Sequence, residues 1–169
     1  MPLIIKGNHI DGERTSVCVP VTAKNRDELV PIVARLIRRG VKMIEWRIDC
    51  YEDHEDFENV RETLFMLRRF TDEVVFIATL RTEAEGGMAK LNGEALLSYY
   101  KAIAQTHCAD IIDVEYLSLG DNLKEAVDML HANGALVLLS HHDFKKTPED
   151  VKLSGLFYDM YEKDANTLF

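Results

Sequence analysis

Residues 16–49, SVCVPVTAKNRDELVPIVARLIRRGVKMIEWRID, indicate the fold class of this chain. The run 16–21 is short, apolar and rich in valine, which is typical of a strand. Apolar positions then recur at helical spacing from about residue 25 to residue 39, and Gly40 marks the end of that helix. A second apolar run follows at 41–48. The stretch therefore predicts one strand–helix–strand unit.

The same alternation continues along the chain. Further strands are expected at 74–80, 110–115 and 135–140, with the start of a sixth strand at 167–169. Further helices are expected at 55–70, 93–107, 122–133 and 148–161. This alternation predicts parallel strands with right-handed helical crossovers, in a single α/β domain over 1–169. Before the first strand, the turn residues Gly7-Asn8 and Asp11-Gly12 predict a small hairpin.

Two α/β architectures fit this pattern. A flavodoxin-like sheet of five strands suits 169 residues, whereas a (β/α)8 TIM barrel typically needs about 250 residues. Length alone favours the flavodoxin-like sheet. The first strand, however, leads into Pro20-Val21-Thr22-Ala23-Lys24, which has no glycine-rich turn to hold a nucleotide phosphate.

Polar residues gather at the carboxyl ends of four predicted strands. Alternate residues of a strand share a face, so Glu45, Arg47 and Asp49 point one way, while Trp46 points into the core. The same rule pairs residues at the next three strand ends: Thr79 with Arg81, Asp113 with Glu115, and Ser140 with His142. Ligands of parallel α/β proteins bind at this end, which predicts a binding site here. The structural alternative is a set of solvated strand tips, with Glu45 and Arg47 as an ion pair.

Composition narrows the classes of partner and the location. A net charge of −9 argues against binding to nucleic acid or to anionic lipid, both of which need clustered lysine and arginine. The first eight residues do not resemble a signal peptide and no apolar run is long enough to span a bilayer, so a cytoplasmic location is expected. Three cysteines without C-x-x-C spacing suggest neither a disulfide framework nor a zinc site.

Three blocks resemble the motifs of type I 3-dehydroquinate dehydratase in order and spacing. They are EWRID from Glu45, LRTEAEGG from Leu80 and SHHDFKKTP from Ser140. The resemblance runs from about Val17 to the last residue and implies an eight-stranded (β/α) barrel, present here as five units and the start of strand six. It also implies a lyase of the shikimate pathway that converts 3-dehydroquinate to 3-dehydroshikimate without a metal or another cofactor.

The resemblance implies roles for individual residues. His142 is expected as the acid/base and Glu85 as the carboxylate that orients it. Glu45, Arg47 and Arg81 match the substrate-binding positions, and Trp46, in the same motif, is included among the expected substrate-binding residues. His141, on the opposite strand face, is expected to be a packing or hydrogen-bonding residue. Asp49, Asp113 and Glu115 are expected to support the site without contacting the substrate.

One feature of the family pattern is missing. The family's imine-forming lysine lies on the sixth strand, just beyond the match to residues 167–169, so we expect this chain alone to be inactive and truncated. The expected partner is a second copy, since a homodimer is the family's common state, or a complementary C-terminal fragment. Two rival functions stay open: a non-catalytic half-barrel that binds a metabolite or partner, and a metal-dependent barrel using His141, His142 and Asp143.

Overall fold

Six strands form one parallel sheet in which neighbours in sequence are neighbours in space. The structure is a computed structural model and describes residues 3–10, 15–163 and 167–168. The strand order is β3-β4-β5-β6-β7-β8. Their bounds are β3 Cys18–Val21, β4 Met43–Arg47, β5 Val75–Thr79, β6 Ile111–Glu115, β7 Leu136–Ser140 and β8 Thr167–Leu168.

Helices connect the consecutive strands. They are α1 Arg26–Arg38, α2 Phe57–Arg68, α3 Gly93–Gln105, α4 Leu123–Ala132 and α5 Asp150–Tyr161. Short 3-10 helices follow three of the strands: η1 Ile48–Cys50, η2 Glu83–Glu85 and η3 Gly120–Asn122. The bounds lie within about two residues of those expected from the sequence pattern, and two of the helices begin at a capping side chain. Asn25 caps α1 by accepting from the Glu28 N–H, and Asp56 caps α2 by accepting from the Glu58 and Asn59 N–H groups.

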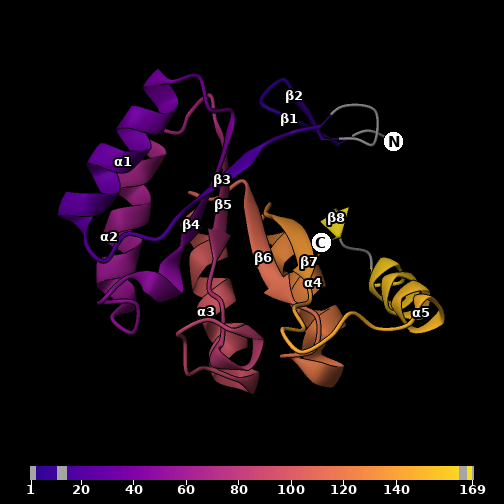
Figure 1. The fold of residues 1–169 in the computed structure, drawn as a ribbon. Coiled ribbons are helices and arrows are strands. Elements are labelled where there is room, and N and C mark those ends of the chain that lie inside the picture. The colour runs from indigo at the N-terminus through magenta and orange to yellow at the C-terminus, as the bar shows by residue number, and fades with distance from the viewer. Residues whose placement is uncertain (1–2, 11–14, 164–166, 169) are drawn as a thin grey trace.

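The strand order decides between the two architectures. A flavodoxin-like sheet has the order 2-1-3-4-5, so its chain reverses direction across the sheet and helices cover both faces. Here the order is sequential, and the helices lie along the outer side of a curved sheet (Figure 1). This is the winding of a (β/α) barrel, and the flavodoxin-like alternative is therefore wrong.

Side chains of the two sheet faces enter two separate apolar clusters. The outer cluster lies between sheet and helices and contains Ile44, Trp46, Leu64 and Tyr100. The inner cluster is small and contains Ile5, Met43, Val75, Ile77 and Ile111. Along β4 the clusters alternate, with Met43 inside and Ile44 outside. The period-two pattern of the sequence therefore separates the inner face from the helix-covered face.

A two-stranded hairpin covers the amino end of the inner face. Its strands are β1 Leu3–Ile5 and β2 Asn8–Ile10, paired antiparallel. The turn residues Lys6 and Gly7 both have positive φ, 49° and 74°, as two-residue hairpin turns require. The predicted hairpin is confirmed at Gly7, while Asn8 already belongs to β2. The expected turn at Asp11-Gly12 lies outside the described residues.

Lys6 anchors this hairpin to the sheet. Its ammonium donates to the carbonyls of Thr71 and Val74 at 2.8 and 2.9 Å, and it lies 2.8 Å from Asp110 Oδ2. Asp110 also pairs with Arg68 at 3.0 Å and accepts from the backbone N–H of Phe76. One carboxylate thus joins the hairpin, α2 and the start of β5.

None of the helices that the structure describes is long and apolar enough to cross a membrane.

Replacing this anchor is expected to loosen the hairpin. Lys6→Met removes three partly buried contacts but keeps the apolar stem, so the free energy of unfolding should fall by about 1–3 kcal/mol. Urea unfolding followed by circular dichroism measures this change. Lys124→Met is the matched control, because it removes an exposed ion pair to Asp128 within α4 and should leave the midpoint nearly unchanged. Equal midpoints for the two variants would contradict the anchoring role.

Candidate active site

A cavity of about 390 Å³ lies on the inner face of the sheet. Its wall is apolar toward the hairpin, where Ile10, Met43, Ile77, Ile111 and Leu138 contribute. It is polar toward the carboxyl ends of the strands. The polar lining residues there are Glu45, Arg47, Arg81, Glu85, Asp113 and His142. The structure therefore brings five of the six predicted site residues to one cavity.

The sixth, Trp46, lies elsewhere. Its side chain is 1% exposed and packs in the outer core, edge-on against Tyr51 with the ring centroids 5.6 Å apart. It does not line the cavity. The structure therefore does not bring Trp46 to the site with the other expected substrate-binding residues, because strand alternation turns it away from its inward-facing neighbours Glu45 and Arg47.

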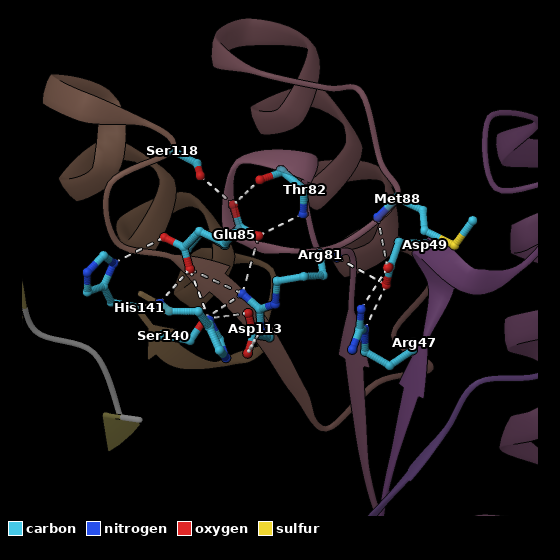
Figure 2. Close-up of polar contacts among 12 residues, drawn as sticks. Arg47, Asp49, Arg81, Thr82, Glu85, Met88, Asp113, Ser118, Ser140 and His141 are labelled. Atoms are coloured by element: carbon cyan, nitrogen blue, oxygen red, sulfur yellow. Dashed lines mark hydrogen bonds and ion pairs between the residues drawn. The ribbon is translucent and has the colours of Figure 1, made fainter. Parts of the chain in front are cut away.

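Arg81 is the centre of the polar network (Figure 2). Its guanidinium donates through Nη2 to Asp113 at 2.9 Å, and through Nη1 to Ser140 Oγ at 2.9 Å and to Glu115 at 3.3 Å. Ser140 in turn donates to the other oxygen of Asp113 at 2.8 Å. The residues come from three strand ends or the loops that follow them, so this network ties the carboxyl ends of β5, β6 and β7 together.

Around Arg81 the negative charges outnumber the positive one. Three buried carboxylates share this cation, since Glu85 Oε2 also lies 3.8 Å from Nη1. Burial raises the pKa of Asp113 to about 6, although Arg81 partly opposes that rise. Burial alone would lower the pKa of Arg81, but the charges of Asp113 and Glu115 raise it above its ordinary value.

Glu115 holds the loop that carries Glu85. One of its oxygens accepts from the Thr82 N–H at 2.7 Å, and the other accepts from Thr82 Oγ1 at 2.6 Å and from Ser118 Oγ. The side chain is fully buried, so water cannot replace any of these hydrogen bonds if it is lost. Glu115 thus fixes the start of η2, and through η2 it fixes the position of Glu85.

Two glycines close the same loop. Gly87 donates to Thr82 O at 2.7 Å, and a Cβ added there would lie 2.1 Å from the backbone oxygen of Arg81. Gly86 has φ of 80°, and a Cβ there would lie 2.3 Å from the ring of Phe144. The glycine pair of the LRTEAEGG block is therefore required by close approach and by backbone conformation.

Glu85 contacts both histidines of the SHHDF stretch. Oε2 lies 3.0 Å from His142 Nδ1 and accepts from the His142 backbone N–H at 3.0 Å, while Oε1 lies 3.3 Å from His141 Nδ1. His142 lines the cavity and His141 does not, and the contact of His141 with Glu85 is the hydrogen-bonding role expected of it. β7 ends at Ser140, so strand alternation alone does not give the partners of the two residues that follow.

Arg47 pairs with Asp49 and not with Glu45, its partner in the structural alternative. Its guanidinium makes two parallel contacts with Asp49, both at 2.8 Å, instead of an ion pair with Glu45. Hydrogen bonds to Asp49 raise the pKa of Arg47, although burial opposes this. Asp49 also accepts from the N–H groups of Arg81 and Met88, so it joins the β4 and β5 loops.

Cys18 and Phe144 are among the cavity-wall residues that sequence reasoning missed. Cys18 lines the cavity, and burial with the nearby charge of Glu45 raises the pKa of its thiol to about 12. Phe144 also lines it and stacks on His142, with the ring centroids 6.3 Å apart. The parity of β3 could have predicted the inward direction of Cys18, but no local pattern indicates Phe144.

The proposed metal ligands do not converge. Within residues 3–10, 15–163 and 167–168, no group of three or more His, Cys, Asp or Glu side chains could hold a metal ion. Asp143 instead accepts from the backbone N–H groups of Lys145 and Lys146, and so fixes the turn after the histidines.

Comparison with known proteins identifies the family. The family model for type I 3-dehydroquinase matches residues 17–168. The chain belongs to the type I 3-dehydroquinase family. It is 31% identical to the 3-dehydroquinate dehydratase of Clostridioides difficile strain 630 over 163 residues, and 38% identical to that of Clostridium botulinum over 133 residues. These matches cover 96% and 78% of this chain, but 64% and 52% of the respective relatives.

A solved 3-dehydroquinase also matches this fold. The crystal structure of the Clostridium difficile type I enzyme, with covalently modified comenic acid, superposes with a TM-score of 0.94 at 28% identity. The match covers 99% of this chain and 66% of that one. The chain thus spans just under two thirds of the length of the first curated 3-dehydroquinase that it matches.

Closing the loop between Arg81 and Ala89 requires Gly87. Gly87→Ala places a Cβ against the backbone of Arg81, so the loop must shift and the free energy of unfolding should fall by about 1–3 kcal/mol. Gly155→Ala is the matched control, because it lies within α5 with open space around it and should raise stability by about 0.5–1 kcal/mol. Urea midpoints measure both, and a neutral Gly87→Ala would show that the close approach is not required.

Burial of Asp113 predicts a pH dependence of stability. Its folded pKa of about 6 lies above the ordinary 3.8, so the folded state binds this proton more tightly than the unfolded state. The resulting stability is fully present below the unfolded pKa and is lost as pH rises through 6. Asp113→Asn cannot titrate, so the stability of the wild type relative to this variant should be greater at pH 5 than at pH 8 by about 1 kcal/mol.

The check is urea unfolding of both proteins at the two pH values. Comparing them removes the contribution of every other titrating group that they share. A difference with the opposite sign would mean that Arg81 and Ser140 stabilise the ionised carboxylate more than burial disfavours it.

Proposed function

We propose that the protein contributes the acid/base half of a 3-dehydroquinate dehydratase, which removes water from 3-dehydroquinate to give 3-dehydroshikimate. The observation that carries this proposal is the contact of Glu85 with His142 at 3.0 Å, at the polar end of a cavity. A carboxylate only accepts hydrogen bonds, so His142 Nδ1 carries the hydrogen and Nε2 is left as the base.

The chemistry needs an acidic C–H bond. In the family a lysine amine forms an imine with the substrate ketone, and the iminium withdraws electrons from the neighbouring carbon. His142 would remove the proton from that carbon and then return one to the departing hydroxyl group. The proton that His142 takes from carbon leaves with the hydroxyl group as water, so the histidine is neutral again at the end of each cycle.

The arginines and Glu45 would orient the substrate. Arg81 has five N–H donors, and its contacts with Asp113, Ser140 and Glu115 leave others for a hydroxyl group. Glu45 and Arg47 line the same cavity one strand away. Since Asp49, Asp113 and Glu115 hold these guanidiniums in place, we propose that they support the site and do not contact the substrate.

The imine-forming amine is proposed to lie outside this chain. Among the residues that the structure describes, no lysine lines the cavity. Lys145 and Lys146 lie beyond the histidines, and their backbone N–H groups donate to the Asp143 carboxylate. We therefore propose that these 169 residues form one incomplete barrel domain that needs a complementary C-terminal segment for activity. The apolar inner face from Met43 to Leu138 is where that segment would pack.

The assembly is proposed to be a homodimer in the cytoplasm. Both proposals rest on the family to which the chain belongs. A non-catalytic binding module is the second candidate. The same apolar inner face favours it, because a partner could occupy that face without any imine chemistry.

Borohydride trapping tests the function. The chain is incubated with 3-dehydroquinate, alone or with a separate polypeptide that corresponds to the last third of the Clostridioides difficile relative, then reduced and weighed by intact mass spectrometry. We expect an adduct on the added polypeptide only when this chain is present. The adduct should have lost one water, because dehydration precedes reduction.

His142→Asn separates the two steps of the reaction. It should still give an adduct, but one heavier by a water molecule, since the base is missing. His107→Asn, an exposed position that follows α3, is the matched control and should behave as the wild type. An adduct on this chain alone would contradict the proposed position of the amine. Substrate binding without any adduct would favour the non-catalytic module.

A further inference from the structure

The carboxylate of Glu85 is shared by two adjacent imidazoles. Oε2 receives both contacts from His142, one from the backbone N–H and one from Nδ1, each at 3.0 Å. Oε1 lies 3.3 Å from His141 Nδ1. Figure 2 shows Glu85 between the His141 ring and the Arg81 guanidinium. The two oxygens of one carboxylate thus have different partners.

Each of these contacts needs a hydrogen on the ring nitrogen. An ionised carboxylate has no proton to donate, so both imidazoles have the hydrogen on Nδ1 and leave Nε2 as acceptor. For His142 this is the tautomer that a base facing the cavity requires. For His141 it means that the ring acts on Glu85 as a donor.

The contact with His141 limits how the carboxylate can turn. Glu85 is 4% exposed, so little water is available to Oε1 if His141 is removed. Arg81 Nη1 lies 3.8 Å from Oε2 and would attract whichever oxygen turns toward it. A rotated carboxylate would move Oε2 away from His142 Nδ1.

The other neighbours of His142 do not select its tautomer. Phe144 stacks on the ring, with 14° between the planes, and supplies no donor or acceptor. The backbone N–H of His142 binds the same Oε2 but does not depend on the ring hydrogen. The tautomer therefore depends on where Glu85 places Oε2.

We propose that His141 is a positioning residue for His142, acting through Glu85. By occupying Oε1 it keeps Oε2 in line with His142 Nδ1, and so keeps His142 Nε2 as the acceptor at the cavity. This role rests on the proposed function of His142 as the acid/base, and it assigns to His141 more than packing.

The tautomer can be measured without any activity. The full chain is prepared with ¹⁵N-labelled histidine, and the nitrogen shifts of each imidazole are read from ring correlation spectra at a pH where the rings are neutral. In the wild type the Nδ1–H form of His142 should dominate. In His141→Ala the ratio of the Nδ1–H to the Nε2–H form at His142 should fall by about fivefold or more.

Rescue separates hydrogen bonding from packing. His141→Asn places an amide N–H near the position of Nδ1, and it should restore the wild-type ratio. His141→Phe keeps a ring without a donor, so it should behave like the alanine variant and replaces it if that variant does not fold. His107→Asn, at a left-handed position that asparagine tolerates, is the control and should leave His142 unchanged.

Two results would overturn the positioning role. One is the same His142 tautomer ratio in the wild type and in folded His141→Ala or His141→Phe. The other is a change that asparagine does not rescue, which would assign the effect to packing. Neither result depends on substrate, so failure of the dehydratase proposal shows up separately, in the trapping experiment.

Discussion

The carboxyl end of the sheet depends on the guanidinium of one buried residue, Arg81. An ionic group inside a protein is stable only when its partners replace water, and here Asp113, Glu115 and Ser140 do so. Because these partners come from β6, β7 and their ends, the cation holds three strands in register at the site. The loop with Glu85 begins at the next residue, Thr82, and Glu115 fixes that residue too. The acid/base pair is thus supported by a network that has no exposed member.

Much of this arrangement could be predicted because strands impose a period of two. The inward direction of Glu45, Arg47 and Arg81 follows from parity alone, as does the burial of Trp46. Beyond the end of a strand, however, the rule does not give the partner that a side chain contacts. At His141 the chain has left β7, and its ring returns to the same carboxylate as its neighbour. Arg47 likewise pairs with Asp49, because η1 turns the chain back after β4.

The architecture needed information that local patterns do not contain. Alternating strands and helices fit both a singly wound and a doubly wound sheet, and only the strand order separates them. Chain length favoured the wrong alternative, since length reports how many units are present and not how they are wound. The three sequence blocks compensated for this, because their spacing follows the strand ends of one family. The contact of Phe144 with Gly86 joins two loops far apart in sequence, and no period could predict it.

The burial of Trp46 has a spectroscopic consequence. It is the only tryptophan in the sequence, so the tryptophan fluorescence of the folded chain comes from one indole with 1% exposure. That indole lies on the strand that also carries Glu45 and Arg47, but on its outer face, against Tyr51. Its emission therefore reports on the layer directly behind the cavity. A ligand or a second polypeptide that alters β4 from the inner side can be followed without an added label.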